Sequence, residues 1–301
     1  MIKNSHRLNI ILSQTISALT PLLATLAALG IFAIILATLG ANPLEAYGAL
    51  VEGAVGSPNA IADTLVKATP LLLIGLGTCI AFRGGVTNIG GEGQLVVGAL
   101  AATFLGLLYP EAPGYVIIPL AMLAGFLAGG VWGAIPGALK AYFNVNEILS
   151  TIMMNQIAVQ GMNFLLRGPM IDPIQLEAAS KIPQTARLAK EFDLIRLVPT
   201  RLHLGALIAV IVAVLVYIFL WRTTIGYRIR AVGLNADAAR YAGINVKRYM
   251  VLSLLLSGAL GGLAGAIQVY GVTHRMFTDG SAAGFTGSAG FNGIVAALFG
   301  Q

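Results

Sequence analysis

Long apolar runs alternate with short polar segments along almost the whole chain. Several of them approach or exceed the ~20 residues that a helix needs to cross the hydrocarbon core of a bilayer. The alternating ten-residue segments that a transmembrane β-barrel requires are absent. The pattern therefore predicts an all-α, polytopic transmembrane helical bundle. We expect its spans over residues 16–39, 62–82, 94–108, 115–139, 148–166, 204–221 and 251–272.

Composition supports a membrane protein. Hydrophobic residues make up 57% of 301 positions, against roughly 45–50% apolar content in soluble domains. The first apolar run is too long for the core of a cleavable signal, so it is interpreted as a retained span. The net charge of +6 is explained by basic residues at the ends of spans rather than by binding to nucleic acid.

The charged segments predict an orientation. Lys3 and Arg7 favour a cytoplasmic amino terminus, and residues 40–60 contain two acids without Lys or Arg, which favours the outside. Six crossings then place residues 222–250 in the cytoplasm. The last apolar run, residues 290–301, is too short to cross a bilayer as a helix. It either dips into the membrane or marks a truncated carboxyl terminus. We expect truncation, and treat residues 1–301 as a single permease domain.

The most basic part of the chain is residues 222–250, where six Arg or Lys accompany one Asp up to Arg248. Its middle predicts a short helix over residues 236–242, because Asn235 is a good N-cap and Gly243 a good C-terminal stop. An ordinary positively charged loop is the alternative. A solvated loop has little need of a capped, alanine-rich helix, so the pattern favours a docking element in the cytoplasm.

A glycine-rich break, GGVTNIGGEGQ, covers residues 84–94 between two apolar runs. Transporters interrupt spans in this way to make discontinuous helices whose free backbone groups line a substrate path. Asn88, Glu92 and Gln94 are therefore candidate pathway residues. The alternative for Glu92 is that it only caps the half-helix that follows, at the positive end of the helix dipole.

A polar stripe marks the expected span 148–166. Gln156, Gln160 and Asn163 stand at i, i+4 and i+7 on one helical face, with Asn155 beside them. Amides within hydrocarbon need partners, so the stripe faces either a pathway for a neutral, hydroxyl-rich solute or another helix. Both interpretations stay open here.

Glycines on a four-residue repeat, Gly125, Gly129, Gly133 and Gly137, predict a groove where another helix approaches closely. Enzyme chemistry finds no support, since no nucleophile and base are arranged together, so we expect no catalytic residue and no cofactor. Three His and one Cys suggest no metal cluster. GxxxxGK followed by Ser or Thr is also missing, so the chain has no P-loop ATPase of its own.

Three segments together resemble the permease subunits of bacterial ABC importers for branched-chain amino acids, simple sugars and nucleosides. They are TNIGGEGQLVVGALAA, WGAIPGALKAYFNVNEILSTIMMN and GYRIRAVGLNADAARYAGINVKRYMVLSLLLSGALGGLAGA. Among the branches of this family, the motifs in these segments are most similar to those of the nucleoside or simple-sugar permeases. The positions that match the family's coupling-helix pattern are Gly233, Asn235, Ala239, Arg240, Gly243 and Ile244.

The resemblance implies a multi-pass protein of the bacterial inner membrane, embedded in lipid. It implies a separate ABC ATPase subunit, a second permease subunit in a homo- or heterodimer, and an extracytoplasmic solute-binding lipoprotein as partners, with no nucleic acid. The main alternative is a secondary transporter driven by an ion gradient, for which Glu92 is the strongest titratable candidate. A structural membrane protein without transport would explain the glycine repeat but neither the broken span nor the capped loop.

Overall fold

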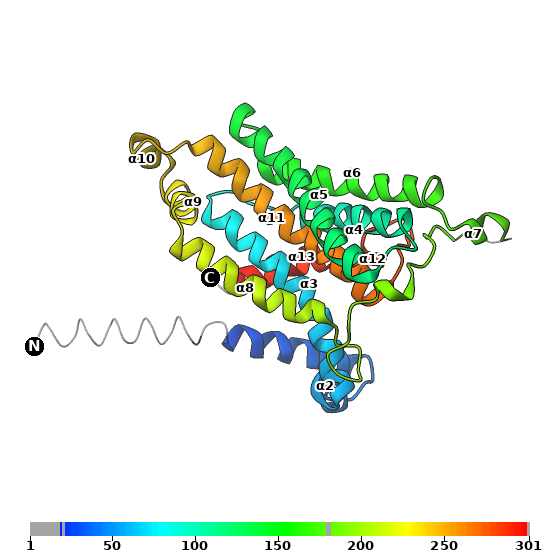
Figure 1. The fold of residues 1–301 in the computed structure, drawn as a ribbon. Helices are drawn as coiled ribbons and strands as arrows, with labels where there is room; N and C mark the ends of the chain where they lie inside the picture. The colour runs from blue at the N-terminus through cyan, green and yellow to red at the C-terminus, as the bar shows by residue number, and fades with distance from the viewer. Residues whose placement is uncertain (1–18, 20–21, 179–181, 300–301) are drawn as a thin grey trace, which may run out of the picture. The chain divides into compact units, whose positions relative to one another are not determined.

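The computed structural model describes residues 19, 22–178 and 182–299, and the elements within them are helices (Figure 1). The chain divides into two compact units, residues 1–61 and 62–301. The expected cytoplasmic segment at residues 1–14 and the start of the first expected span lie outside the described residues. A single domain therefore stays a prediction.

The first unit contains the apolar helix Leu22–Thr38 and α2 (Pro43–Val55). The sequence predicted only a connection over residues 40–60, so α2 is a correction. The signals for this helix are local: Asn42 accepts a hydrogen bond from Leu44 N at 3.1 Å, and Pro43 occupies the first helical position. The Tyr47 hydroxyl donates to the carbonyl of Leu29 and ties α2 to the helix before it.

The second unit holds the remaining long helices, with the expected spans displaced by only a few residues at their ends. The helices are α3 (Pro58–Arg83, which begins in the first unit), α4 (Gly91–Leu108), α5 (Gly114–Phe143), α6 (Glu147–Arg167), α8 (Leu204–Arg222) and α11 (Val246–Gln268, continued by the π-helical turn Val269–Thr273). The shorter elements are α7 (Pro173–Glu177), the 3-10 turn Lys190–Phe192, α9 (Thr224–Leu234), α10 (Ala236–Tyr241), α12 (Ala283–Thr286) and α13 (Ala289–Phe299).

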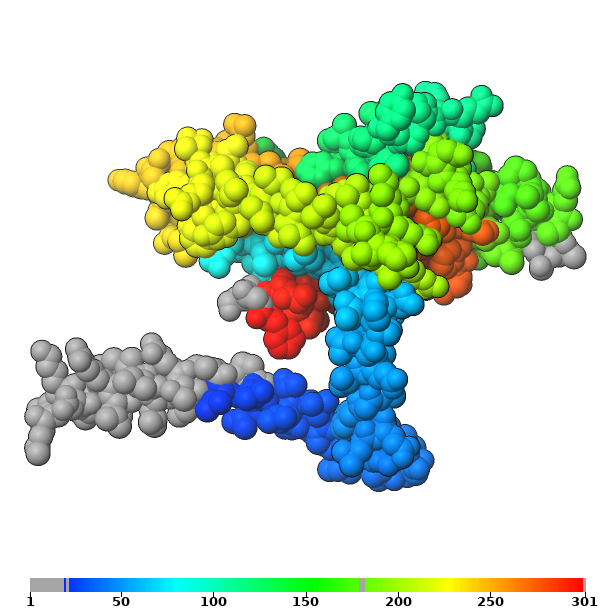
Figure 2. Space-filling view, turned by 60° about the horizontal axis from the view of Figure 1, so that its bottom comes forward, coloured from blue at the N-terminus to red at the C-terminus, as the bar shows by residue number. Residues whose placement is uncertain are grey.

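Five described helices are long and apolar enough to cross a membrane: α3, α4, α5, α8 and α11 with its π-helical turn. The α6 helix has 21 residues but is not among them, because its polar stripe lowers its hydropathy. The α13 helix has only 11 residues, in line with the short apolar run in the sequence. In Figure 2, α13 (red) lies next to α3 (cyan), where Gly293 packs against the side chain of Ile74.

Backbone contact among α4, α5 and α11 forms the centre of the second unit (Figure 1). A Cβ added at Gly98 of α4 would lie 2.2 Å from the Cα of Gly262 in α11. A Cβ at Gly129 of α5 would lie 2.4 Å from the carbonyl oxygen of Gly258. These distances leave no room for a side chain. The predicted glycine groove is confirmed, and α11 is the helix that fills it.

We predict that Gly129→Ala lowers the thermal stability of the purified protein in detergent, because the new methyl group must displace the α11 backbone. Overpacking of this kind costs about 1–3 kcal/mol. Gly161→Ala in α6 is the matched control, since its Cβ would meet nothing within 4 Å. Equal melting temperatures for the two variants would show that the groove is not closely packed.

Candidate functional site

The glycine-rich break separates α3 from α4, as predicted. The α3 helix ends at Arg83, Gly85 adopts a left-handed conformation with φ of +71°, and α4 begins at Gly91. Backbone groups freed by such a break need partners when they are buried. Side chains of α6, together with Asn88 in the break itself, supply several of them.

Three buried amides, which we call the amide cluster (Asn88, Gln94 and Asn155), hold the break in place. Asn155 of α6 donates to the carbonyl of Ile89 at 2.9 Å and accepts from Gly93 N at 2.8 Å. One side chain thus satisfies a backbone donor and a backbone acceptor 62 and 66 residues away. The position of α6 and the conformation of the break are therefore linked.

The other two amides bind each other, and Asn88 also binds α11. The Asn88 side chain donates to the side-chain oxygen Oε1 of Gln94 at 3.0 Å and to the Ser257 hydroxyl at 2.7 Å. Its own carbonyl oxygen accepts from Gly90 N at 2.8 Å and from Gln94 Nε2 at 3.2 Å. Both side chains are 2% exposed. Much of their hydrogen-bonding capacity is used within the protein.

Glu92 lies at the start of two helices. It is 3% exposed and sits in the first turn of α4. Its Oε1 accepts from the backbone N of Gly290, in the first turn of α13, at 3.1 Å. Its Oε2 has no hydrogen-bond partner in the described part of the chain. A carboxylate is stabilised at helix N-termini, so Glu92 joins the beginnings of α4 and α13.

The predicted polar stripe on α6 does not act as one surface. Asn155 is buried in the amide cluster, whereas Gln156 and Gln160 are exposed. Asn163 is half-buried, donates to the carbonyl of Gly280 at 3.2 Å and accepts from the Thr278 hydroxyl at 2.7 Å. The fold therefore brings Asn155 to Asn88 and Gln94, while the other three amides lie apart from them.

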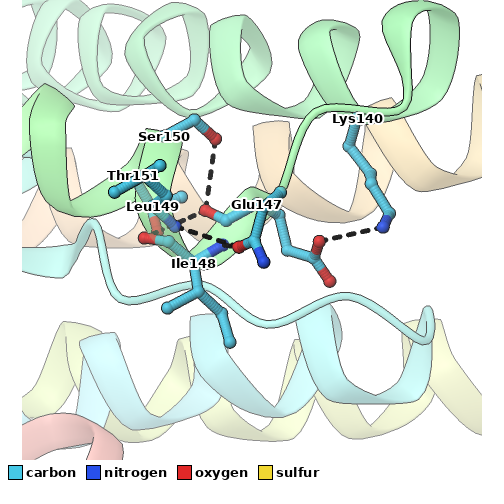
Figure 3. Close-up of polar contacts among 7 residues, drawn as sticks. Lys140, Glu147, Ile148, Leu149, Ser150 and Thr151 are labelled. Atoms are coloured by element: carbon cyan, nitrogen blue, oxygen red, sulfur yellow. Dashed lines mark hydrogen bonds and ion pairs between the residues drawn. The ribbon is translucent and has the colours of Figure 1, made fainter.

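The first turns of α6 also contact the break, and Figure 3 shows the polar contacts that hold this end of α6. Asn146 caps α6 by accepting from Ile148 N and Leu149 N, and Lys140 pairs with Glu147 at 3.0 Å. Thr151 donates to the Glu147 carbonyl at 2.7 Å and accepts from Ile89 N, in the break, at 3.4 Å. No local sequence pattern indicates a role for Thr151, because its partner in the break is 62 residues away.

The basic segment contains two helices rather than one. We call α9, α10 and the turn to α11 the coupling segment (residues 224–245). Asn235 caps α10 as predicted, accepting from Asp237 N at 3.0 Å and Ala238 N at 2.9 Å. Gly243 ends it with φ of +80°, and Ile244 N donates to the carbonyl of Ala239 at 2.9 Å.

The two faces of the coupling segment differ. Ala239 is buried against α9 and α11 together with Ile229, Val232, Val246 and Tyr249. Arg240 and Asn235 are exposed, and Leu234 and Tyr241 are 88% and 98% exposed. The face opposite to the buried one thus carries two large side chains that the rest of the chain leaves almost completely uncovered.

The coupling segment contacts the break directly. A Cβ added at Gly233 would lie 2.2 Å from the carbonyl oxygen of Arg83 and 2.7 Å from the amide N of Gly85. The Arg230 guanidinium of α9 stacks over the ring of Trp221, near the end of α8, with its central carbon 4.1 Å from the ring centroid. The sequence predicted both segments as functional. Their contact is a finding of the structure.

At the other end of α11, residues 182–203 run along residues 270–278. Thr185 N donates to the carbonyl of Met276 at 2.8 Å, and Leu194 N donates to that of Tyr270 at 2.9 Å. His274 Nδ1 pairs with Asp193 Oδ1 at 2.7 Å. Among the described residues, no group of three or more His, Cys, Asp or Glu side chains could hold a metal ion.

His203 is buried beside this contact and caps α8, its Nδ1 accepting from Gly205 N at 3.1 Å. An accepting Nδ1 places the ring proton on Nε2, which has no partner in the described part of the chain. Burial, with a smaller contribution from nearby His274, lowers the pKa of His203 from 6.5 to about 4. The neutral ring is therefore the stable form in the fold.

We predict that Asn155→Ala destabilises the fold and loosens the backbone of the break, because it leaves Gly93 N and the Ile89 carbonyl without partners. Each buried orphan group costs about 1–3 kcal/mol. Gln156→Ala, which removes an exposed amide from the neighbouring position, is the matched control. Thermal unfolding and limited proteolysis of the break would measure both. Equal behaviour of the two variants would contradict a structural role for Asn155.

We predict that stability falls as the pH drops below about 6.5 and continues to fall towards about 4. The unfolded chain binds a proton at His203 in this window, whereas the folded chain resists it. His203→Asn keeps an N-cap oxygen and should flatten this part of the pH profile of the melting temperature. His274→Gln measures separately the smaller contribution of the neighbouring histidine. An unchanged slope in the His203→Asn variant would contradict the assignment.

A family model described as branched-chain amino acid transport system / permease component matches residues 60–301. The chain is 39% identical over 282 residues to a guanosine ABC transporter permease protein of Bacillus subtilis, covering 94% of this chain and 79% of that protein. It is 32% identical over 297 residues to a nucleoside ABC transporter permease protein of Lactococcus lactis, covering 96% and 79%.

A third relative is named for another solute class. A glucose ABC transporter permease protein of Haloferax volcanii is 34% identical over 293 residues, which cover 94% of this chain and 74% of that protein. No solved structure matches the chain with significance.

Proposed function

We propose that this chain, which belongs to the family of branched-chain amino acid transport system permease components, carries nucleosides across a bacterial membrane. It is the permease subunit of an ABC importer for nucleosides or sugars, and ATP is hydrolysed on a separate subunit. Nucleosides are favoured because the guanosine permease is 39% identical to this chain, against 34% for the glucose permease. Family membership favours ATP as the energy source over an ion gradient.

The coupling segment is the proposed site where the ATPase subunit acts. Its exposed Leu234 and Tyr241 form the docking surface, and Gly233 transmits movement through its backbone contact with Arg83 and Gly85. The left-handed Gly243 allows α10 to turn sharply into α11. This arrangement requires the coupling segment to lie in the cytoplasm, as the charge pattern predicts.

The amide cluster is proposed to set the position of the break during transport. Asn88, which also binds Gln94, binds α11 through Ser257, and Asn155 binds α6 to the break. A shift of the break at Gly85 would therefore move both helices. Glu92 would carry the same movement to α13 through Gly290.

The exposed face of α6 is proposed to line a solute pathway that this chain shares with a second permease subunit. Gln156 and Gln160 are exposed there, next to apolar residues of the same helix. Exposed amides within a membrane-spanning bundle need partners. A second permease subunit, with solute passing between the two, would supply them. An extracytoplasmic solute-binding protein would deliver the solute to the opposite end, at residues 182–203.

We predict that Tyr241→Ala strongly reduces ATP-dependent uptake by the complete transporter in proteoliposomes. Removing a nearly fully exposed aromatic side chain from a docking surface costs about 2 kcal/mol or more when the residue is a hot spot, which is roughly a 30-fold or greater loss of ATPase affinity. Co-purification of the ATPase subunit and uptake of guanosine are the two readouts.

Tyr115→Ala is the matched control, because Tyr115 is 81% exposed at the first turn of α5, away from the coupling segment. It should leave ATPase binding unchanged. Two results would contradict the proposal: full ATPase binding by the Tyr241→Ala variant, or uptake by the wild type that continues without ATPase subunits and follows an ion gradient instead.

A further inference from the structure

A cavity of about 520 Å³ lies between α3, the end of α11, α12 and α13. Its size falls within the ~300–1,000 Å³ typical of small-molecule sites. Such sites are mainly apolar, with a few polar groups that orient the ligand. The lining here has that character, and its polar and aromatic members include Lys67, Gln268, Phe277, Phe285, Thr286 and Asn292. The pathway residues proposed from the sequence are absent from this lining.

Two amides in the lining are free to bind a ligand. In the described part of the chain, the side chains of Gln268 and Asn292 form no hydrogen bond with another residue. A primary amide offers donors and an acceptor together, which suits the mixed edge of a nucleobase. Lys67 adds a cation, and no carboxylate lines the cavity. A neutral solute rich in acceptors therefore fits better than a cationic one.

Two aromatic rings meet in the same wall. Phe277 and Phe285 are arranged edge to face, with ring centroids 6.0 Å apart and planes at 78°. Phe285 is held by burial, whereas Phe277 is only half-buried. Base–aromatic stacking is worth about 1–3 kcal/mol per base. A partly exposed ring that is braced by a buried one, in the same cavity as free amides, is a combination that binds a flat, polar ring.

We infer that this cavity is a binding site for a nucleoside within the permease, with the base against Phe277 and its edge at Gln268 and Asn292. The inference rests on the proposed function and names its site. It also connects that site to the break. Asn292 lies two positions after Gly290, whose N binds Glu92, so a ligand at Asn292 contacts the helix that Glu92 joins to α4.

Uptake kinetics of the complete transporter in proteoliposomes test the site. Gln268→Ala and Asn292→Ala should each raise the KM for guanosine about 10-fold, as the loss of one well-formed hydrogen bond predicts. Asn59→Ala is the matched control, because Asn59 is an exposed amide in the first turn of α3 and does not line the cavity. Its KM should equal that of the wild type.

A labelling experiment tests ligand binding directly, so it remains informative if an alanine variant loses uptake because of misfolding. Cys79 is the single cysteine of the chain, so Cys79→Ser with Gln268→Cys gives one thiol in the cavity. Guanosine should slow the reaction of this thiol with a water-soluble maleimide at least several-fold, and glucose should not.

The outcomes separate the two proposals. If the wild type imports guanosine while the alanine variants keep its KM and guanosine gives no protection, the site is wrong and the function stands. If the wild type imports glucose but not guanosine, the nucleoside assignment fails. Protection by glucose alone would then make the cavity a sugar site and overturn the inference.

Discussion

Close backbone contact between α4, α5 and α11 is the constraint on which the second unit depends. The glycines at Gly98, Gly129 and Gly262 bring three helices to distances where no side chain fits. Within a membrane, the hydrophobic effect does not drive helices together, so association relies on van der Waals contact and hydrogen bonds. Because these helices pack along their backbones, the ends of α4 and α11 are fixed relative to each other.

That packing explains why a broken span can be tolerated. Free backbone groups at membrane depth are stable only where protein covers them. Asn88 can reach Ser257 because α4 and α11 already touch, and Asn155 can reach Ile89 because α6 packs against α4. The amide cluster is thus a consequence of the helix packing and also the reason that the break keeps one conformation.

The break occupies a central place between the proposed sites of energy input and solute binding. On one side it meets Gly233 of the coupling segment. On the other it leads through Glu92 to Gly290 and α13, which lines the large cavity. A coupled equilibrium requires contacts that differ between two states. The short, glycine-rich contacts at both ends of the break are suited to such a change because small backbone shifts make or remove them.

The sequence by itself determined the features that depend on neighbouring residues: the membrane class, the helix positions within a few residues, and the Asn235 cap of α10. It also contained the signal for α2, in Asn42 and Pro43, although charge pattern alone suggested a connection. The glycine repeat on α5 predicted a close neighbour without identifying it. These signals are short-range, so the chain shows them before it folds.

Only the tertiary structure decided which distant residues meet. The contacts of Asn155 with Ile89 and of Glu92 with Gly290 join positions 66 and 198 residues apart. The polar stripe on α6 looked uniform in sequence, yet Asn155 became buried while Gln156 stayed exposed. A helical period fixes which residues share a face, but it does not state what covers that face. That depends on how the helices pack, and here close glycine contacts set the packing.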